Sequence, residues 1–514
     1  MNIIYLLCAY FVFHEILKTE VRADQWTLPA SNPHTRSDLY IYIYSSSEWD
    51  SIATSSMHAR SEDEIMESSM NRGAGPEMNA TTGAFHTDQY QLYSIIYHRI
   101  LKDPRRTLDP SIATTFFVPY DLASDAAYYK HCAKNKDHKC FDFRKCPQGP
   151  RVNDLLLESP WWQRRGGRDH LLVVGMNYAM DHYIGKPKCK ELLIGACANC
   201  TKIAIDDYSY LHSGSHGTKE KGDFWHAVPF PANFHWTRNV QRPFPWENMD
   251  RPLLVSYIGS TQSFYNPARR LRGSLAHFCS LYPSDCVHAT YGSSGRSVFF
   301  EAGQNPLSLS SRSVFCFQPI GDLMTRKGLF DSMLQGCLPV VFEDLTASVM
   351  YTWHWEEAFW REVVVALPFH GTAHRYFDPV AALQKMRAQN ATLIAQKQAL
   401  LRSRIFELQY SLDHSHQEVF RKSSGSSAME WSTTWPRVEA EGGVVLDEQA
   451  CAQGRGWPMR DAYDITMDHV LGWHSGREMD FRNATVPECW NGFHDTRANN
   501  GKGKCVVQTP AAQK

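Results

Sequence analysis

Short apolar strands that alternate with helical segments are the feature that most limits how this chain can fold. Strand-like runs occupy residues 113–118, 170–175, 202–205, 253–258, 313–317 and 338–342, and segments with helical spacing lie among them. This alternation predicts an α/β fold, with parallel sheets covered by helices in the doubly wound style. A join at 238–251, rich in Pro, Trp and charge, divides the strands into two series. We therefore expect two lobes.

The length of the chain supports this division, because 514 residues are too many for one compact core. The expected boundaries place a leader at 1–23, a first lobe at 38–240, a second lobe at 251–410, a linker at 423–427 and a Cys-containing extension at 435–514. The sequence assigns no role to the extension. A formal net charge of −1 argues against a general nucleic-acid binder, which needs a basic excess.

The N-terminus predicts entry into the secretory pathway. Residues 3–13 form an unbroken apolar run that is too short to span a bilayer but typical of a signal-peptide core, and small residues precede Asp24. A short uncleaved anchor or a buried helix would account for the same run. Four acceptor triplets for N-glycosylation, at Asn79, Asn199, Asn390 and Asn483, fit passage through the lumen.

Fourteen cysteines suit an oxidising compartment. Eleven of the thirteen after the leader fall into local groups, which we interpret as disulfide staples of unknown connectivity: Cys132, Cys140 and Cys146; Cys189, Cys197 and Cys200; Cys279 and Cys286; Cys451, Cys489 and Cys505. The second group could instead bind zinc, but an oxidising lumen favours disulfides.

Residues 313–342 carry the strongest chemical signal and read SVFCFQPIGDLMTRKGLFDSMLQGCLPVVF. The pattern predicts strand, turn, helix, turn and strand, with Gly321 in the first turn and Thr325 capping a helix that runs to about residue 335. Arg326 and Lys327 then lie in the first helical turn, where basic residues oppose the helix dipole unless an anion is near. A diphosphate would resolve that conflict. The alternative is an ordinary βαβ unit with basic residues on its surface.

This segment resembles the signature of exostosin-like glycosyltransferases (family 47), especially the plant-type xyloglucan galactosyltransferase branch. Those enzymes carry similar Phe-Cys-Leu-Gln-Pro, Gly-Asp, Thr-Arg-Arg, Phe-Asp and Gly-Cys-Ile-Pro-Val elements. A second match, PWWQRRGGRDH at 160–170, resembles the family's Trp, Gly-Gly and Arg-Asp-His block. Shorter matches follow in the family's order: FFVPY at 116–120, YIGS at 257–260, residues 269–273, and YTWH at 351–354.

The resemblance implies a GT-B architecture, in which two Rossmann-like lobes face a central cleft. It also implies an inverting transfer from a UDP-sugar to a glycan, with an acceptor-side first lobe and a nucleotide-sugar-binding second lobe. The chain contains no Asp-x-Asp triplet, the usual metal-diphosphate grip of the other large architecture, so we expect neither metal nor other cofactor. The donor site is expected to include Gly259, Arg269, Arg272, Gly321, Asp322, Thr325, Arg326 and Lys327.

Inversion needs a base that takes the proton of the acceptor hydroxyl. Asp169, His170 and Asp181 in the first lobe are the candidates, although Asp169 and His170 could simply hold loops together through hydrogen bonds. Trp161 and Trp162 could form a platform for the acceptor sugar or pack the lobe.

Departures from the family pattern keep a second hypothesis open. Arg326-Lys327-Gly328 replaces the usual Arg-Arg pair, and a lysine lacks the bidentate fork of arginine. The chain could therefore be a catalytically silent relative that binds glycan or partners an active transferase. A third hypothesis is a glycoside hydrolase, which needs two carboxylates across a cleft. No motif in the sequence supports it. The resemblance implies that the protein works in the Golgi lumen and that the transferred sugar is galactose. Whether an N-terminal anchor holds the protein in the membrane, and whether it forms homo- or hetero-oligomers, stays open.

Overall fold

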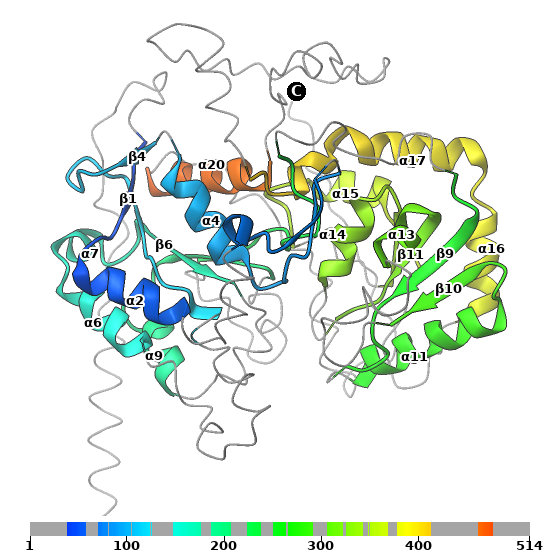
Figure 1. Cartoon of the computed structure of the whole chain (residues 1–514), viewed down its shortest axis with the longest axis horizontal. Helices are drawn as coiled ribbons and strands as arrows, with labels where there is room; N and C mark the ends of the chain where they lie inside the picture. The colour runs from blue at the N-terminus through cyan, green and yellow to red at the C-terminus, as the bar shows by residue number, and fades with distance from the viewer. Residues whose placement is uncertain are drawn as a thin grey trace, which may run out of the picture. The chain divides into compact units, whose positions relative to one another are not determined.

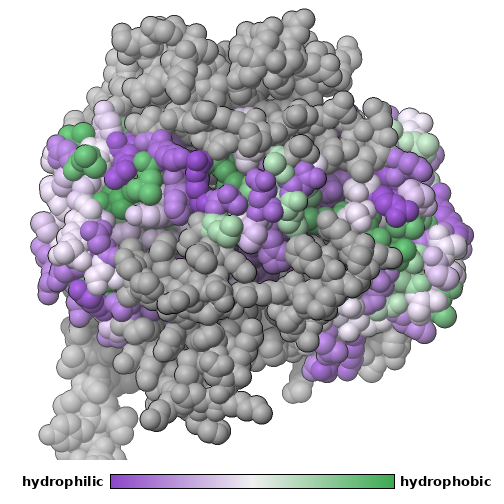
Figure 2. Space-filling view, in the orientation of Figure 1, coloured by the Kyte–Doolittle hydropathy of each residue, from purple (hydrophilic) through white to green (hydrophobic). Residues whose placement is uncertain are grey.

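The computed structural model describes residues 39–57, 70–80, 82–103, 105–123, 125, 148–175, 187–206, 224–237, 250–263, 266–290, 306–321, 325–342, 348, 350–367, 378–412 and 461–475 (Figure 1). Within these ranges, none of the helices combines the length and the apolar character that crossing a bilayer requires. The predicted leader, the linker at 423–427 and most of the C-terminal extension lie outside them. Figure 2 shows hydrophilic residues over much of the described surface on one face, with hydrophobic patches between them.

The first lobe is built on a six-stranded parallel sheet of order β4-β1-β5-β6-β7-β8. Its strands are β1 (Ile41–Ile43), β4 (Arg106–Thr107), β5 (Thr115–Phe117), β6 (His170–Val174), β7 (Thr201–Ala204) and β8 (Trp225–Ala227). Its helices are α2 (Ser47–Met57), α4 (Leu92–Leu101), α6 (Gly149–Glu158), α7 (Pro160–Arg165) and α9 (Pro187–Ile194). A short turn η2 (Met70–Gly73) and a hairpin of β2 (Glu77–Asn79) and β3 (Ala84–Phe85) precede α4.

Alternation along β6 shows how the sheet is covered on both faces. Leu171 and Val173 belong to a core cluster with side chains of α4, whereas Leu172 and Val174 belong to a cluster with side chains of α2, α6 and α9. Successive side chains of a strand point to opposite faces, so the unbroken apolar run of β6 is what a sheet buried on both sides requires. The strand is fully buried.

The second lobe is built on a five-stranded parallel sheet of order β10-β9-β11-β12-β13. Its strands are β9 (Leu253–Ile258), β10 (Cys286–Ala289), β11 (Ser313–Gln318), β12 (Leu338–Val341) and β13 (Val365–Ala366). Its helices are α11 (Asn266–Leu281), α13 (Pro306–Ser311), α14 (Lys327–Met333), α15 (Glu357–Val363), α16 (Pro379–Arg387) and α17 (Ala391–Arg404), with a final turn η5 (Ile405–Leu408). The predicted α/β fold with two Rossmann-like lobes is confirmed by these two sheets.

The C-terminal extension contributes a helix to the first lobe. Asp461 begins α20 (Ala462–His474) with a capping box, accepting from the Asp464 backbone N–H at 3.0 Å. The Asp461 carboxylate also pairs with the buried Arg99 of α4, and His474 contacts the hydroxyls of Thr115 (2.9 Å) and Thr201 (2.8 Å). This helix of the segment without an expected role is thus part of the buried core.

Disulfides follow the sequence prediction only in part. Cys279 and Cys286 form the predicted local bridge, and a second bridge joins Cys316 of β11 to Cys337 beside β12. The second bridge was not predicted, because it depends on the pairing of two strands. Cys197 and Cys200 are buried and unbridged among the described residues, which contradicts the expectation of a staple there. The groups at 132–146 and 451–505 lie outside the described residues.

Candidate functional site

Strand order places the first candidate site in the second lobe. The first strand of this sheet, β9, lies between the second strand β10 and the third strand β11. In open parallel sheets of this order, ligands bind outside the carboxyl ends of the strands, where the order reverses. In this lobe that switch point lies between the ends of β9 and β11, which are Ile258 and Gln318. Gly259 and Gly321, two of the predicted donor-site residues, follow these strands closely.

Arg326 lies at this switch point. Its Nη2 donates to the carbonyl of Ile258 at 2.6 Å. Glycines flank the guanidinium, because a Cβ at Gly259 would lie 2.5 Å from Nη2 and one at Gly328 would lie 3.0 Å from it. Among the described residues, the buried Nη1 has no hydrogen-bond partner. A fixed guanidinium with an unused donor is suited to bind an anion.

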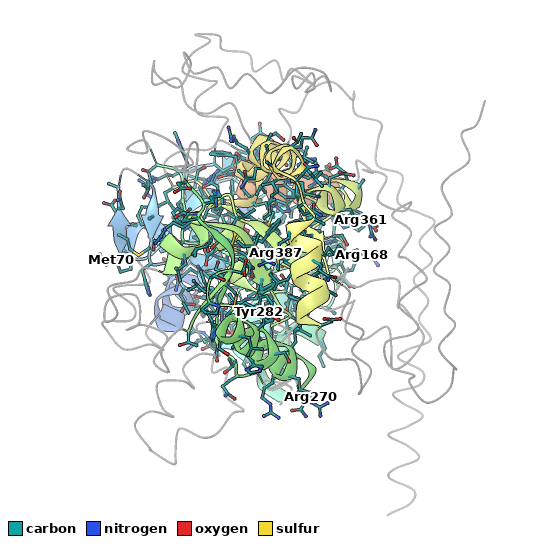
Figure 3. The ribbon with its side chains drawn as sticks, turned by 90° about the vertical axis from the view of Figure 1, so that its right-hand side faces the viewer. Met70, Arg168, Arg270, Tyr282, Arg361 and Arg387 are labelled. Carbon is teal, nitrogen blue, oxygen red and sulfur yellow. A yellow bond between two sulfur atoms is a disulfide. The ribbon has the colours of Figure 1, made fainter. Side chains whose placement is uncertain are left out.

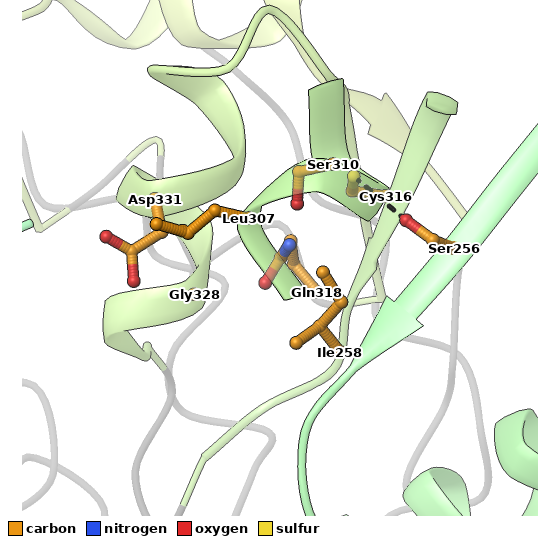
Figure 4. Close-up of a pocket in the computed structure, with 8 residues that line it drawn as sticks. All are labelled: Ser256, Ile258, Leu307, Ser310, Cys316, Gln318, Gly328 and Asp331. Carbon is orange, nitrogen blue, oxygen red and sulfur yellow. Dashed lines mark hydrogen bonds between the residues drawn. The ribbon is translucent and has the colours of Figure 1, made fainter. Parts of the chain in front are cut away.

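A small pocket lies near this switch point, among β9, β11, α13 and α14 (Figure 4). Its volume is about 10 Å³, which is room for about one water molecule. Its lining comes from β9, α13, β11 and α14: Ser256, Ile258, Leu307, Ser310, Cys316, Gln318, Gly328 and Asp331. The Gln318 side chain donates from Nε2 to the Ser332 hydroxyl (2.9 Å), and its Oε1 has no partner among the described residues.

Lys327 forms an ion pair with Asp331. Its Nζ lies 2.7 Å from the Asp331 carboxylate, which also accepts from the backbone N–H of Asn233 at 2.7 Å. Burial lowers the pKa of Lys327, and Asp331 partly opposes that shift. The lysine therefore helps to join α14 to the first lobe, and its predicted contact with a diphosphate stays a prediction.

The prediction that Thr325 caps the helix is wrong. The helix begins at Lys327, so the N-cap is Arg326, and no side chain caps it. Thr325 is buried, with its hydroxyl 3.1 Å from the hydroxyl of Tyr351. The Thr325 hydroxyl therefore takes part in the contact between the lobes and does not cap the helix.

The two arginines of α11 that were predicted for the donor site, Arg269 and Arg272, have different roles. Arg272 is buried and donates to the carbonyls of Gln262 (2.6 Å) and Ile320 (3.1 Å), which follow β9 and β11 respectively. It therefore braces both loops of the switch point. Arg269 is exposed and contacts Asn266 at 2.7 Å, and its neighbour Arg270 projects from the outer side of α11 (Figure 3). Gly321 is buried, and Asp322 lies outside the described residues.

Asp169 and His170 lie at the amino end of β6, the edge opposite to the one where parallel sheets bind ligands. His170 contacts Asp169 at 2.9 Å through Nδ1 and the Tyr44 hydroxyl at 2.7 Å through Nε2, and Arg164 pairs with Asp169 at 3.0 Å. Burial lowers the pKa of His170. Burial raises the pKa of Asp169, but its bonds to His170 and Arg164 outweigh burial and lower it. This geometry favours the alternative that the pair stabilises the lobe.

The two tryptophans also pack the first lobe. Trp161 stacks on Phe116 with ring centroids 6.1 Å apart, and the Trp162 indole donates to the Ala196 carbonyl at 2.8 Å. Gly167 makes this packing feasible, because a Cβ there would lie 2.7 Å from the Trp162 ring nitrogen. The packing alternative is therefore favoured over an acceptor platform. Asp181, the third candidate base, lies outside the described residues.

Contacts between the lobes identify residues that sequence reasoning missed. The Tyr351 hydroxyl, from the loop after β12, donates to the Ile205 carbonyl after β7 (3.0 Å) and also meets Thr325. The Trp353 ring stacks between His226 of β8 (4.1 Å) and His469 of α20 (4.9 Å). In the described parts of the chain, no three His, Cys, Asp or Glu side chains come together as a metal-binding group.

Comparison with known proteins gives one family match. Residues 35–370 match the model of the exostosin GT47 domain. Among curated relatives from Arabidopsis thaliana, probable xyloglucan galactosyltransferase GT19 is 27% identical over 325 residues, covering 58% of this chain and 67% of its own. Xyloglucan-specific galacturonosyltransferase 1 is 29% identical over 54% of this chain and 39% of its own. Xyloglucan galactosyltransferase MUR3 is 27% identical over 55% of this chain and 44% of its own. The match thus spans between about two-fifths and two-thirds of these relatives.

Proposed function

Because this chain belongs to the exostosin GT47 family, we propose that it is an inverting glycosyltransferase that moves a sugar from a UDP-sugar to a glycan hydroxyl. The observation that carries this proposal is Arg326, a guanidinium held at the switch point of the second sheet with an unused N–H donor. Nucleotide diphosphates bind at such switch points in doubly wound sheets.

In this mechanism the donor diphosphate binds beside the carboxyl ends of β9 and β11. As the bond from the sugar to the diphosphate breaks, negative charge builds on the departing UDP. Arg326 then stabilises that charge, and its fixed position means that little reorganisation is needed during the reaction. Arg272 positions the loops that form this site. We propose that the protein needs no metal ion for this step.

The relatives' names guide the choice of sugar and acceptor. Two of the three are named as galactosyltransferases and one as a galacturonosyltransferase, all toward xyloglucan. We therefore propose UDP-galactose or its uronic acid as donor and a xyloglucan-like polysaccharide as acceptor. We also propose that the protein acts in the lumen of the Golgi. Two disulfides and an exposed glycosylation triplet at Asn390 support this location.

One observation favours a second candidate, a silent subunit that binds glycan or partners an active transferase. Lys327, which stands at the position of the second arginine in the family pattern, is paired with Asp331. Within the described part of the 313–342 segment, Arg326 is then the one cation left for a diphosphate. A weak donor site would suit a protein that binds and does not transfer.

Release of UDP by the purified chain tests the proposal. A panel of UDP-sugars is supplied with a xyloglucan acceptor, with and without a chelator, to the wild type, Arg326→Ala and the matched control Arg270→Ala. The proposal predicts release with one donor, unchanged by chelator, at least tenfold lower in Arg326→Ala and unchanged in Arg270→Ala. No release from folded wild type with any donor would favour the silent subunit.

A further inference from the structure

The carboxyl end of β7 is the part of the first lobe that meets the Arg326 turn. β7 lies inside the sheet between β6 and β8, and Ile205 and Asp206 follow it. The Ile205 carbonyl accepts the Tyr351 hydroxyl at 3.0 Å, and the same hydroxyl lies 3.1 Å from the Thr325 hydroxyl. Two hydrogen bonds therefore connect the residue before Asp206 to the residue before Arg326.

Asp206 is close to this connection. It is 1% exposed. Burial is the main reason for the high pKa of Tyr351, and the negative charge of Asp206 raises it further. A carboxylate of the first lobe thus lies near the hydroxyl that bridges to the Arg326 turn of the second lobe.

Two other buried carboxylates of the first lobe, Asp169 and Asp125, are placed differently. Asp169 lies at the amino end of its strand and is paired with Arg164 and His170. Asp125 follows β5 but accepts from the Tyr120 hydroxyl (2.6 Å) and from the Gln148 N–H (3.2 Å) at the start of α6. These bonds give Asp125 a structural role in its own lobe. Asp206 combines a carboxyl-end position with a link to the second lobe.

We propose that Asp206 is the general base of the transfer, an inference that rests on the proposed function. The acceptor hydroxyl oxygen attacks the anomeric carbon and forms the new glycosidic bond. Its proton passes to the Asp206 carboxylate, and the bond from the anomeric carbon to the diphosphate oxygen breaks. The electron pair of that bond leaves with UDP, whose charge Arg326 stabilises. The donor is thus held by the second lobe and the proton is removed from the first.

Substitution of this carboxylate tests the assignment. Asp206→Asn keeps the shape of the side chain and removes its basicity, so the rate constant for transfer, kcat, should fall by about 10²- to 10⁴-fold, the usual contribution of a general base. Binding of UDP, measured by calorimetry, should stay within threefold of wild type. Asp206→Glu keeps a carboxylate and should retain more activity than Asp206→Asn. The matched control Asp154→Asn, an exposed position on α6, should transfer sugar like wild type.

Any of four other results would overturn the assignment of Asp206 as the base. Transfer by Asp206→Asn within tenfold of wild type would exclude a base at this position. Loss of UDP binding in folded Asp206→Asn, or equal losses of transfer in Asp206→Glu and Asp206→Asn, would indicate a structural role. A folded wild type that binds UDP and transfers no sugar would refute the proposed function and the base with it, whereas an active Asp206→Asn refutes the base alone.

Discussion

Gly259 should be essential to the donor site because it makes room for Arg326. A methyl group at this position would lie 2.5 Å from Nη2 and 3.1 Å from Nη1 of the guanidinium. The guanidinium must then move, which breaks its 2.6 Å hydrogen bond to the Ile258 carbonyl. A hydrogen bond from a charged donor contributes about 1.5–3 kcal/mol. The backbone φ of Gly259 is +154°, a region that other residues occupy at a cost of about 1–3 kcal/mol.

Gly259→Ala should therefore lower the free energy of unfolding by about 2.5–6 kcal/mol. Displacing Arg326 should also weaken UDP binding by about 10- to 100-fold, since a charge-assisted contact to phosphate is lost. Denaturant unfolding measures the first effect and calorimetric titration with UDP the second.

Gly273→Ala is the matched control. This glycine lies on the exposed side of α11, and a Cβ there meets no atom within 4 Å. Alanine should stabilise the helix by about 0.5–1 kcal/mol and leave UDP binding unchanged. If Gly259→Ala unfolds within 1 kcal/mol of wild type and binds UDP within threefold, our account of how Arg326 is held is refuted.

Three further predictions concern other parts of the chain. Asp461→Ala removes one of the two carboxylates that pair with the buried Arg99, together with the cap of α20, so denaturant unfolding should show a loss of about 2–5 kcal/mol. Burial lowers the pKa of His474 to about 3, so this histidine stabilises the fold above pH 6.5 and less as the pH falls below it. His474→Gln should remove up to about 1.4 kcal/mol per pH unit from that slope. Thr392→Ala destroys the triplet at Asn390 but keeps the Asn390 cap of α17, so secreted protein should lose one glycan by mass.

Controls distinguish these effects from general damage. Glu357→Ala breaks an exposed pair with Arg361 and should cost under about 1 kcal/mol, and an equal loss in Asp461→Ala would contradict the account of α20. A pH slope that stays unchanged in His474→Gln would contradict the account of its burial. Ala391→Ser keeps the triplet and its glycan, and an unchanged mass in Thr392→Ala would show that Asn390 carries none.

Much of the fold could be predicted because local patterns determine it. The alternation of buried strands with helices predicted both sheets, and the seven-residue spacing of Cys279 and Cys286 indicated their bridge. The return of α20 to the first lobe could not be predicted, because its ion pair joins residues 362 positions apart. The Cys316–Cys337 bridge likewise depends on β11 and β12 being neighbours.

The site was predicted less well, for reasons that particular residues make clear. Asp331 follows Lys327 by four residues, a spacing that predicts an ion pair on a helix and that we did not use. Asp169 comes directly before a buried strand and His170 begins it, so their place at the amino end of the sheet could have been predicted from the sequence. Asp206 comes directly after one, which is the better position for a residue that meets substrate. The role of Tyr351 depends on the contact between the lobes and has no local signal.

The most direct test of the central claim is the mass of the acceptor after incubation with the purified chain. Xyloglucan oligosaccharides are mixed with UDP-galactose or UDP-galacturonic acid, and the products are measured by mass spectrometry with wild type and Arg326→Ala. Our account predicts acceptor that has gained one glycosyl residue from one of these donors with wild type, and at least tenfold less product with Arg326→Ala. Unchanged acceptor with folded wild type that binds UDP, or equal product with Arg326→Ala, would contradict it.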